Sequence, residues 1–142
     1  MTNVSATTTY NPIIPLVGRI LIGLIFLVAG VRKVAVGMGF AGTVAYLTKL
    51  GFPAPEAMAV LAIVIEIGGS ILLIVGWRTR WAAWLLALFV VVAAFAAHRF
   101  WEFTDPGQFN NQLNHFLKNL SIIGGLLYVA TFGPGSASVD KT

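Results

Sequence analysis

The sequence contains no cysteine among its 142 residues. That absence excludes disulfides, thiol–disulfide relays, cysteine-ligated iron–sulfur clusters and thiolate nucleophiles. Charged residues are also scarce, at 10% of the chain, whereas soluble domains carry about a quarter. No segment outside the apolar runs is long enough to form a second core. We therefore expect residues 1–142 to form one polytopic membrane domain.

Basic residues are present but not clustered. The net charge is +4, and no basic patch with interleaved aromatics indicates nucleic-acid binding. The first dozen residues contain no Lys or Arg, so the n-region of a cleaved signal peptide is missing. The first apolar run is therefore expected to be a retained membrane span.

Four apolar runs have lengths suited to membrane-spanning helices, at residues 13–31, 57–76, 81–97 and 113–132. Between the first two, Phe40, Val44, Leu47 and Leu50 fall on one side of a short helix. This pattern predicts an interfacial amphipathic helix or a re-entrant lid over the bundle. Residues 103–111 are predicted to be a polar loop with a turn at 105–107. The expected fold is an all-α membrane protein, an antiparallel four-helix bundle with an extra amphipathic helix between spans 1 and 2.

The second span carries a single charged residue, Glu66, close to its midpoint. An ionised carboxylate at that depth is costly unless it is paired or faces a polar interior. Arg19 shares a helical face with Gly23 and Gly30, which lets helices approach closely. Lys33 lies further along that face, but Arg32–Lys33 is expected to end the first span at the membrane surface. Glu66 is therefore predicted to pair with Arg19, Lys118 or both.

The candidate polar network combines residues from all four spans. We define side A of the membrane as the side of the first span's N-terminal end, and side B as the opposite side. From side A to side B the candidates are Arg19, Glu66, Asn119, Lys118, His115 and His98. Two interpretations remain open. The network either holds helices in register as buried ion pairs, or forms a polar pocket that binds a head group such as a quinone carbonyl or relays a proton.

Other chemistry has little support in the sequence. Two histidines near side B could ligate a haem only as an axial pair, and a zinc site would have to recruit Glu102 or Asp105. We expect those two acids to be solvated loop charges. No nucleophile–base or metal constellation is present, so no catalytic residue and no metal site are predicted.

Stretches covering residues 13–135 resemble a known family of small membrane proteins. They are GRILIGLIFLVAGVRKV, GFAGTVAYLTKLGFPAP, IVIEIGGSILLIVGWRTRWAAWLLALF and NQLNHFLKNLSIIGGLL, and in order and spacing they are similar to the DoxX family. The residues that stand where the family has polar positions are Arg19, Lys33, Glu66, Arg80, His98, His115 and Lys118. The resemblance implies association with quinol- or thiosulfate-linked oxidoreductases or with oxidative-stress complexes; it establishes no cofactor, and a quinone is the candidate that the polar pocket could bind.

Three functions follow as expectations. The first is an accessory or quinone-contacting subunit of a redox complex in the bacterial inner membrane. The second is a scaffold or assembly factor whose polar network is only structural, and the third is a small-solute or proton transporter, which would require oligomerisation. The expected partners are the lipid bilayer, redox-complex subunits and, as an alternative, a second copy of the chain. Arg78 and Arg80 in the tightest loop favour cytoplasmic termini.

Overall fold

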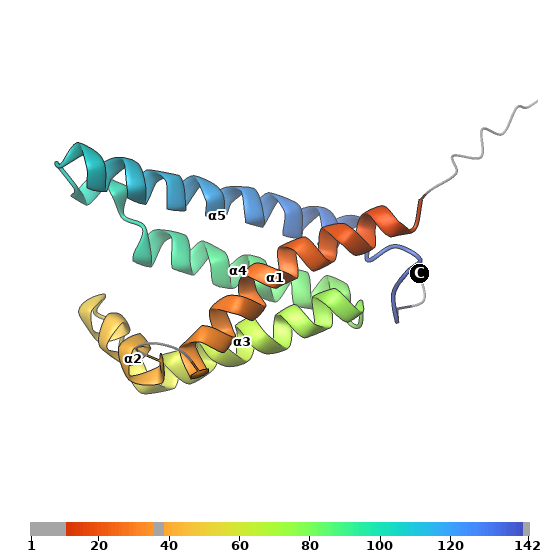
Figure 1. Ribbon diagram of the computed structural model, residues 1–142, viewed down its shortest axis with the longest axis horizontal. Helices are drawn as coiled ribbons and strands as arrows, with labels where there is room; N and C mark the ends of the chain where they lie inside the picture. Colours follow the sequence, from red (N-terminus) through yellow and green to blue (C-terminus); the bar gives the residue numbers. More distant parts are fainter. Residues whose placement is uncertain (1–10, 36–38, 141–142) are drawn as a thin grey trace, which may run out of the picture.

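A computed structural model describes residues 11–35 and 39–140 of the chain. Four long helices, α1 (Ile13–Ala35), α3 (Pro55–Val75), α4 (Thr79–Ala97) and α5 (Pro106–Phe132), run alternately up and down. A short helix, α2 (Gly39–Lys49), joins α1 to α3, and a 3-10 turn, η1 (Phe100–Glu102), joins α4 to α5 (Figure 1). The four long helices are each long and apolar enough to cross a membrane. The predicted all-α, four-span architecture is confirmed.

The fourth span begins earlier than the apolar run indicates. Helix α5 starts at Pro106 rather than Leu113, because the Asp105 carboxylate accepts a hydrogen bond from the Gln108 backbone N–H at 2.9 Å. Proline is favoured in a first helical turn, where its missing N–H has no partner to lose. The predicted turn at residues 105–107 is therefore wrong: the same residue types form a helix cap.

Helices α1 and α3 approach closely at two glycines of α1. A Cβ atom at Gly23 would lie 2.5 Å from Ile74 Cγ1, and one at Gly30 would lie 2.6 Å from Ile67 Cγ1. These distances leave no room for a larger residue, so the pairing of α1 with α3 depends on the small residues. The predicted face of α1 is confirmed, since its buried residues are Arg19, Gly23, Phe26 and Gly30.

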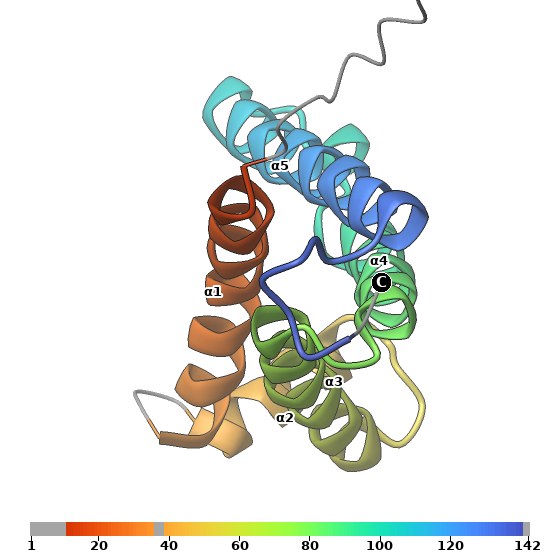
Figure 2. The same ribbon diagram turned by 90° about the vertical axis from the view of Figure 1, so that its right-hand side faces the viewer.

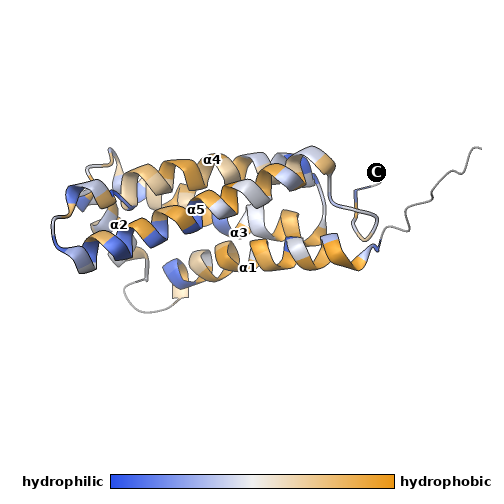
Figure 3. Ribbon diagram, turned by 90° about the horizontal axis from the view of Figure 1, so that it is seen from above, coloured by the Kyte–Doolittle hydropathy of each residue, from blue (hydrophilic) through white to orange (hydrophobic). Residues whose placement is uncertain are grey.

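The bundle consists of two helix pairs, α1 with α3 and α4 with α5, joined where α3 packs on α4 (Figure 1). The apolar core runs along that junction and includes Leu73 of α3, Leu86 and Val90 of α4, and Leu126 of α5. Hydropathy is high along the middle of the long helices, and hydrophilic residues gather toward the end that carries α2 (Figure 3). That end is side B, where α1 ends and α3 begins.

The chain after α5 turns back across side A of the bundle, between the ends of α1, α3 and α4 (Figure 2). The Asp140 backbone N–H donates to Gly76 O at 2.7 Å, and its carboxylate accepts from Thr79 N and Oγ1, both at 2.8 Å. These contacts cap α4, whose own N-cap residue, Arg78, provides no side-chain cap. The hydrogen bond from the Thr79 backbone N–H holds the pKa of Asp140 below its ordinary value. We call residues 133–140 the C-terminal strap.

Candidate functional site

Glu66 is paired with Lys33. The Lys33 ammonium donates to both carboxylate oxygens, at 2.8 Å to Oε1 and 2.7 Å to Oε2. The Glu66 side chain is 6% exposed and that of Lys33 is 27% exposed. Because Glu66 is the twelfth residue of the 21-residue α3, this ion pair lies near the middle of the spanning region rather than at the membrane surface.

Side-chain direction explains the choice of partner. Every side chain of an α-helix leans toward that helix's N-terminus. Helix α1 begins on side A and the antiparallel α3 begins on side B, so Lys33 leans inward from side B and Glu66 leans outward to meet it. The predicted pairing of Glu66 with Arg19 or Lys118 is wrong, because Arg19 leans toward side A and Lys118, on α5, leans toward side B.

Arg19 is fully buried at the other end of the α1–α3 pair. Its guanidinium donates to Leu73 O and Ile74 O, both at 3.0 Å, and to Ala137 O of the C-terminal strap. The carbonyls at a helix C-terminus lack intrahelical partners and carry partial negative charge. Arg19 therefore satisfies the last turn of α3 and fastens the strap. Gly76, at φ +79°, makes room for it, since a Cβ there would meet Arg19 Nη1.

The two predicted histidines form a separate cluster near side B. The rings of His98 and His115 are stacked, with centroids 5.0 Å apart. Gln112 Oε1 lies 2.9 Å from His98 Nδ1, which therefore carries the proton, and Lys118 Nζ lies 3.2 Å from His115 Nδ1. The structure thus brings His98, His115 and Lys118 together, but not with Glu66. Asn119 is buried in α5 and belongs to neither group.

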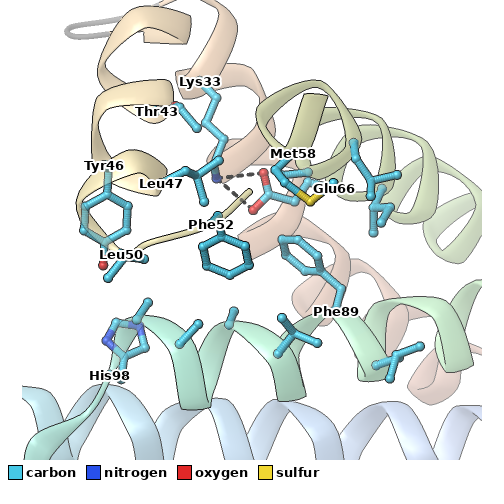
Figure 4. A pocket seen from close by; sticks show the side chains of 18 of the residues that line it. Lys33, Thr43, Tyr46, Leu47, Leu50, Phe52, Met58, Glu66, Phe89 and His98 are labelled. Atoms are coloured by element: carbon cyan, nitrogen blue, oxygen red, sulfur yellow. Dashed lines mark hydrogen bonds and ion pairs between the residues drawn. The ribbon is translucent and has the colours of Figure 1, made fainter. Parts of the chain in front are cut away.

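A cavity of about 460 Å³ connects the ion pair with His98. Its polar lining residues are Lys33, Thr43, Tyr46, Glu66 and His98, and all its other lining residues are apolar. Figure 4 shows Phe52 and Phe89 turned toward the same space as the Glu66 carboxylate. Ligand pockets have this volume and this pattern, with a few polar groups in a mostly apolar wall.

Three of the polar residues that line this cavity were not expected from the sequence. Lys33 was expected at the membrane surface, and Thr43 and Tyr46 belong to the segment expected to form an interfacial helix or a re-entrant lid over the bundle, with no role of their own. In the structure α2 lies over the cavity, with Leu47 and Leu50 also lining it. Burial raises the pKa of the Tyr46 phenol, against the opposing effect of the nearby Arg99 charge. Its hydroxyl therefore remains a hydrogen-bond donor at neutral pH. Two features of the sequence could have indicated these residues: Lys33 lies on the same face of α1 as Arg19, and the segment that contains Thr43 and Tyr46 is amphipathic.

Metal ligation finds no support in the described part of the chain. Residues 11–35 and 39–140 contain no group of three or more His, Asp or Glu side chains that could hold an ion. Glu102 is paired with Arg99 at 3.0 Å, and Asp105 caps α5. Both acids therefore have local structural contacts and do not join the histidines.

Comparison with known proteins agrees with the fold. The DoxX family profile matches residues 14–99. The chain is 38% identical to the inner membrane protein YphA of Escherichia coli over 131 residues, which cover 92% of this chain and 91% of that protein. It is 37% identical to YqjF, another inner membrane protein of the same organism, over 89% of this chain and 88% of YqjF. No solved structure matches the chain.

A more distant similarity covers only part of the chain. A Surfeit locus protein 4 homolog of Schizosaccharomyces pombe is 30% identical over 83 residues, which are 58% of this chain and 28% of that protein. The family match and the two bacterial relatives, by contrast, extend over most of the bundle. The chain therefore belongs to the DoxX family and is an integral inner-membrane protein with four spanning helices.

Proposed function

We propose that the protein binds the ring of a quinone in the cavity beside Lys33 and Glu66, as an accessory, quinone-contacting subunit of a redox-linked membrane complex. One observation carries this proposal: an ion pair of buried Glu66 and half-buried Lys33 lines a mostly apolar cavity at mid-membrane depth. An ionisable group within a membrane span is by default a functional candidate. The redox setting is drawn from the family resemblance.

The lining residues fit a quinone. The Lys33 ammonium has three protons. Within the described residues it donates two hydrogen bonds, one to each carboxylate oxygen of Glu66. The remaining proton is available to a quinone carbonyl, as is the Tyr46 hydroxyl, while Phe52 and Phe89 offer ring faces. Bound there, a quinone would supply a reversible acceptor of electrons and protons. The chain's own contribution is to bind and orient the ring.

The test is a titration of the purified protein with a short-chain quinone analogue, before and after the substitution Glu66→Gln. The wild type should bind saturably. Glu66→Gln should weaken binding about tenfold or more, because the charge that orients Lys33 is lost and charge-assisted hydrogen bonds are worth roughly 1.5–3 kcal/mol. Lys118→Gln, outside the cavity, is the matched control. Absence of saturable binding to the wild type would remove the proposal.

A second candidate function, a scaffold or assembly factor, is favoured by the Arg19 contacts, which serve only structure. If the Lys33–Glu66 pair is likewise structural, Glu66→Gln should lower thermal stability and leave every ligand and partner unaffected. The same titration therefore separates the two functions.

A further inference from the structure

The cavity opens sideways between α3 and α4. Four of its apolar lining residues are strongly exposed on that side: Leu61 at 48%, Leu85 at 44%, Leu88 at 64% and Val92 at 48%. Leu88 is the tenth residue of the 19-residue α4, so it lies near mid-span. The medium at that depth is hydrocarbon rather than water. The opening therefore faces lipid acyl chains.

The opposite side of the cavity is covered. Helix α2 lies over it, and Thr43, Tyr46, Leu47 and Leu50 line it, although Tyr46 is itself 46% exposed. Figure 4 shows α2 and the Lys33–Glu66 pair on one side of the cavity and α4 on the other. The polar lining groups thus lie under α2 and on the inner wall, while the side open to lipid is lined by leucine and valine.

The width of the cavity is set by small residues. Ala62 of α3 and Ala93, Ala96 and Ala97 of α4 line it. From Leu85 to Ala97 the lining follows α4 over 13 residues, or roughly 18 Å at a rise of 1.5 Å per residue. That length exceeds one aromatic ring several times over, so a ring beside Lys33 would leave most of the apolar channel unfilled.

We propose that the ligand is an amphiphile with an apolar tail, which enters from the bilayer between α3 and α4 and leaves its tail along Leu61, Leu88 and Val92. This inference rests on the proposed quinone site and adds the ligand class and its route. The distribution of exposure carries it: Glu66 is buried at 5% exposure, and the exposed edge at mid-span is entirely apolar, whereas the exposed polar lining residue, Tyr46, lies on α2 at side B. A water-soluble, tail-less ligand would have no direct path to this edge.

The first experiment compares a quinone carrying two or more isoprene units with the same ring lacking a tail. The tailed compound should bind the wild type at least about tenfold more tightly, since each buried methylene adds roughly fourfold. Leu88→Trp and Val92→Trp should remove most of that advantage and weaken binding of the bare ring much less. Val91→Trp is the matched control, because Val91 is exposed on α4 but does not line the cavity. Each ligand partitions into detergent micelles to the same extent whichever variant is measured, so the comparison between variants is free of this effect.

A second measurement uses the absence of cysteine, which leaves no labelling background. A single Leu88→Cys variant should react with a lipid-soluble maleimide, and the tailed quinone should slow that reaction about tenfold or more. Leu127→Cys on α5, outside the cavity, should show no protection. Equal binding of the tailed and bare compounds, or equal labelling with and without ligand while binding persists, would overturn the lateral route. Failure of both compounds to bind would instead overturn the quinone site itself.

Discussion

Arg19 and Lys33 are two cations on one face of α1, fourteen residues apart, and the fold uses them differently. Arg19 is enclosed by backbone carbonyls from α3 and the C-terminal strap. Lys33 binds a carboxylate and borders a cavity. The first arrangement completes the structure of side A, whereas the second leaves polar groups facing a space that a ligand could fill.

This difference separates a structural charge from a candidate functional one. Carbonyls at a helix end need donors in any fold, so Arg19 meets a requirement that α3 itself creates. Glu66 meets no such requirement, because an apolar residue would pack at mid-span without a partner. A buried ion pair is weak grounds for stability, so its placement beside a cavity favours a binding role.

The largest effect is expected when only one residue of the Lys33–Glu66 pair is replaced. Lys33→Met should lower the free energy of unfolding by about 3 kcal/mol, because Glu66 is left buried without its partner. The combined substitution of Lys33 and Glu66 by Met should recover most of that loss. Denaturation in detergent, followed by circular dichroism, measures both. A double variant as unstable as the single one would mean that the pair is structural after all.

A smaller loss of stability, which no second substitution is expected to restore, is predicted at Arg19 on side A. Arg19→Met should cost about 2 kcal/mol, since it removes charge-assisted hydrogen bonds and leaves the last carbonyls of α3 unpaired. Arg32→Met, on the exposed side of the same helix, is the control. Quinone binding per folded molecule should remain at the wild-type level. Loss of binding in the folded fraction would show that the two ends are not independent.

Release of the C-terminal strap should cost less again. Asp140→Asn should lower stability by about 1 kcal/mol at neutral pH, the usual value of a helix cap. The folded pKa of Asp140 is lowered, so its contribution is present above the unfolded pKa of about 3.9 and is lost as pH falls through the folded pKa. The difference in melting temperature between wild type and variant should therefore be constant near neutral pH and shrink as the pH falls below about 3.9. A difference that keeps its neutral-pH size in the acid range, or that grows there, would contradict this assignment.

The smallest effect is expected at Lys118, the exposed residue of the cluster with His98 and His115. Lys118→Gln should change stability by less than about 0.5 kcal/mol, as is usual for surface substitutions. It should leave quinone binding unchanged, because Lys118 does not line the cavity. A tenfold weakening of quinone binding by Lys118→Gln would place the ligand at the histidines rather than beside Lys33.

Much of this arrangement is predictable from sequence because membrane spans follow from length and hydropathy alone. The four helices and the buried face of α1 were confirmed. The partner of Glu66 was not predicted, because residue counting places Cα atoms by depth and ignores the lean of side chains. Arg19 is only a few ångströms from mid-span by that count, yet it reaches away from Glu66.

The cavity itself depends on tertiary packing that one sequence does not contain. The pattern of α2 showed an apolar face but not what that face covers. Lys33, next to Arg32 at the end of an apolar run, has the sequence context of an interfacial anchor. Lys33 leans inward because of the direction of α1, the packing of α3 against α1 supplies its partner Glu66, and α4 completes the wall opposite.

The ligand-induced rise in melting temperature is the most direct test of the contrast between the two ends. A ligand that binds only the folded state stabilises it by an amount that increases with the logarithm of the ratio of ligand concentration to Kd. A tailed quinone should raise the melting temperature of the wild type and of Arg19→Met by similar amounts, and should raise that of the double variant Lys33→Met, Glu66→Met much less. An undiminished shift in that double variant would contradict the assignment of the Lys33–Glu66 pair as the ligand site.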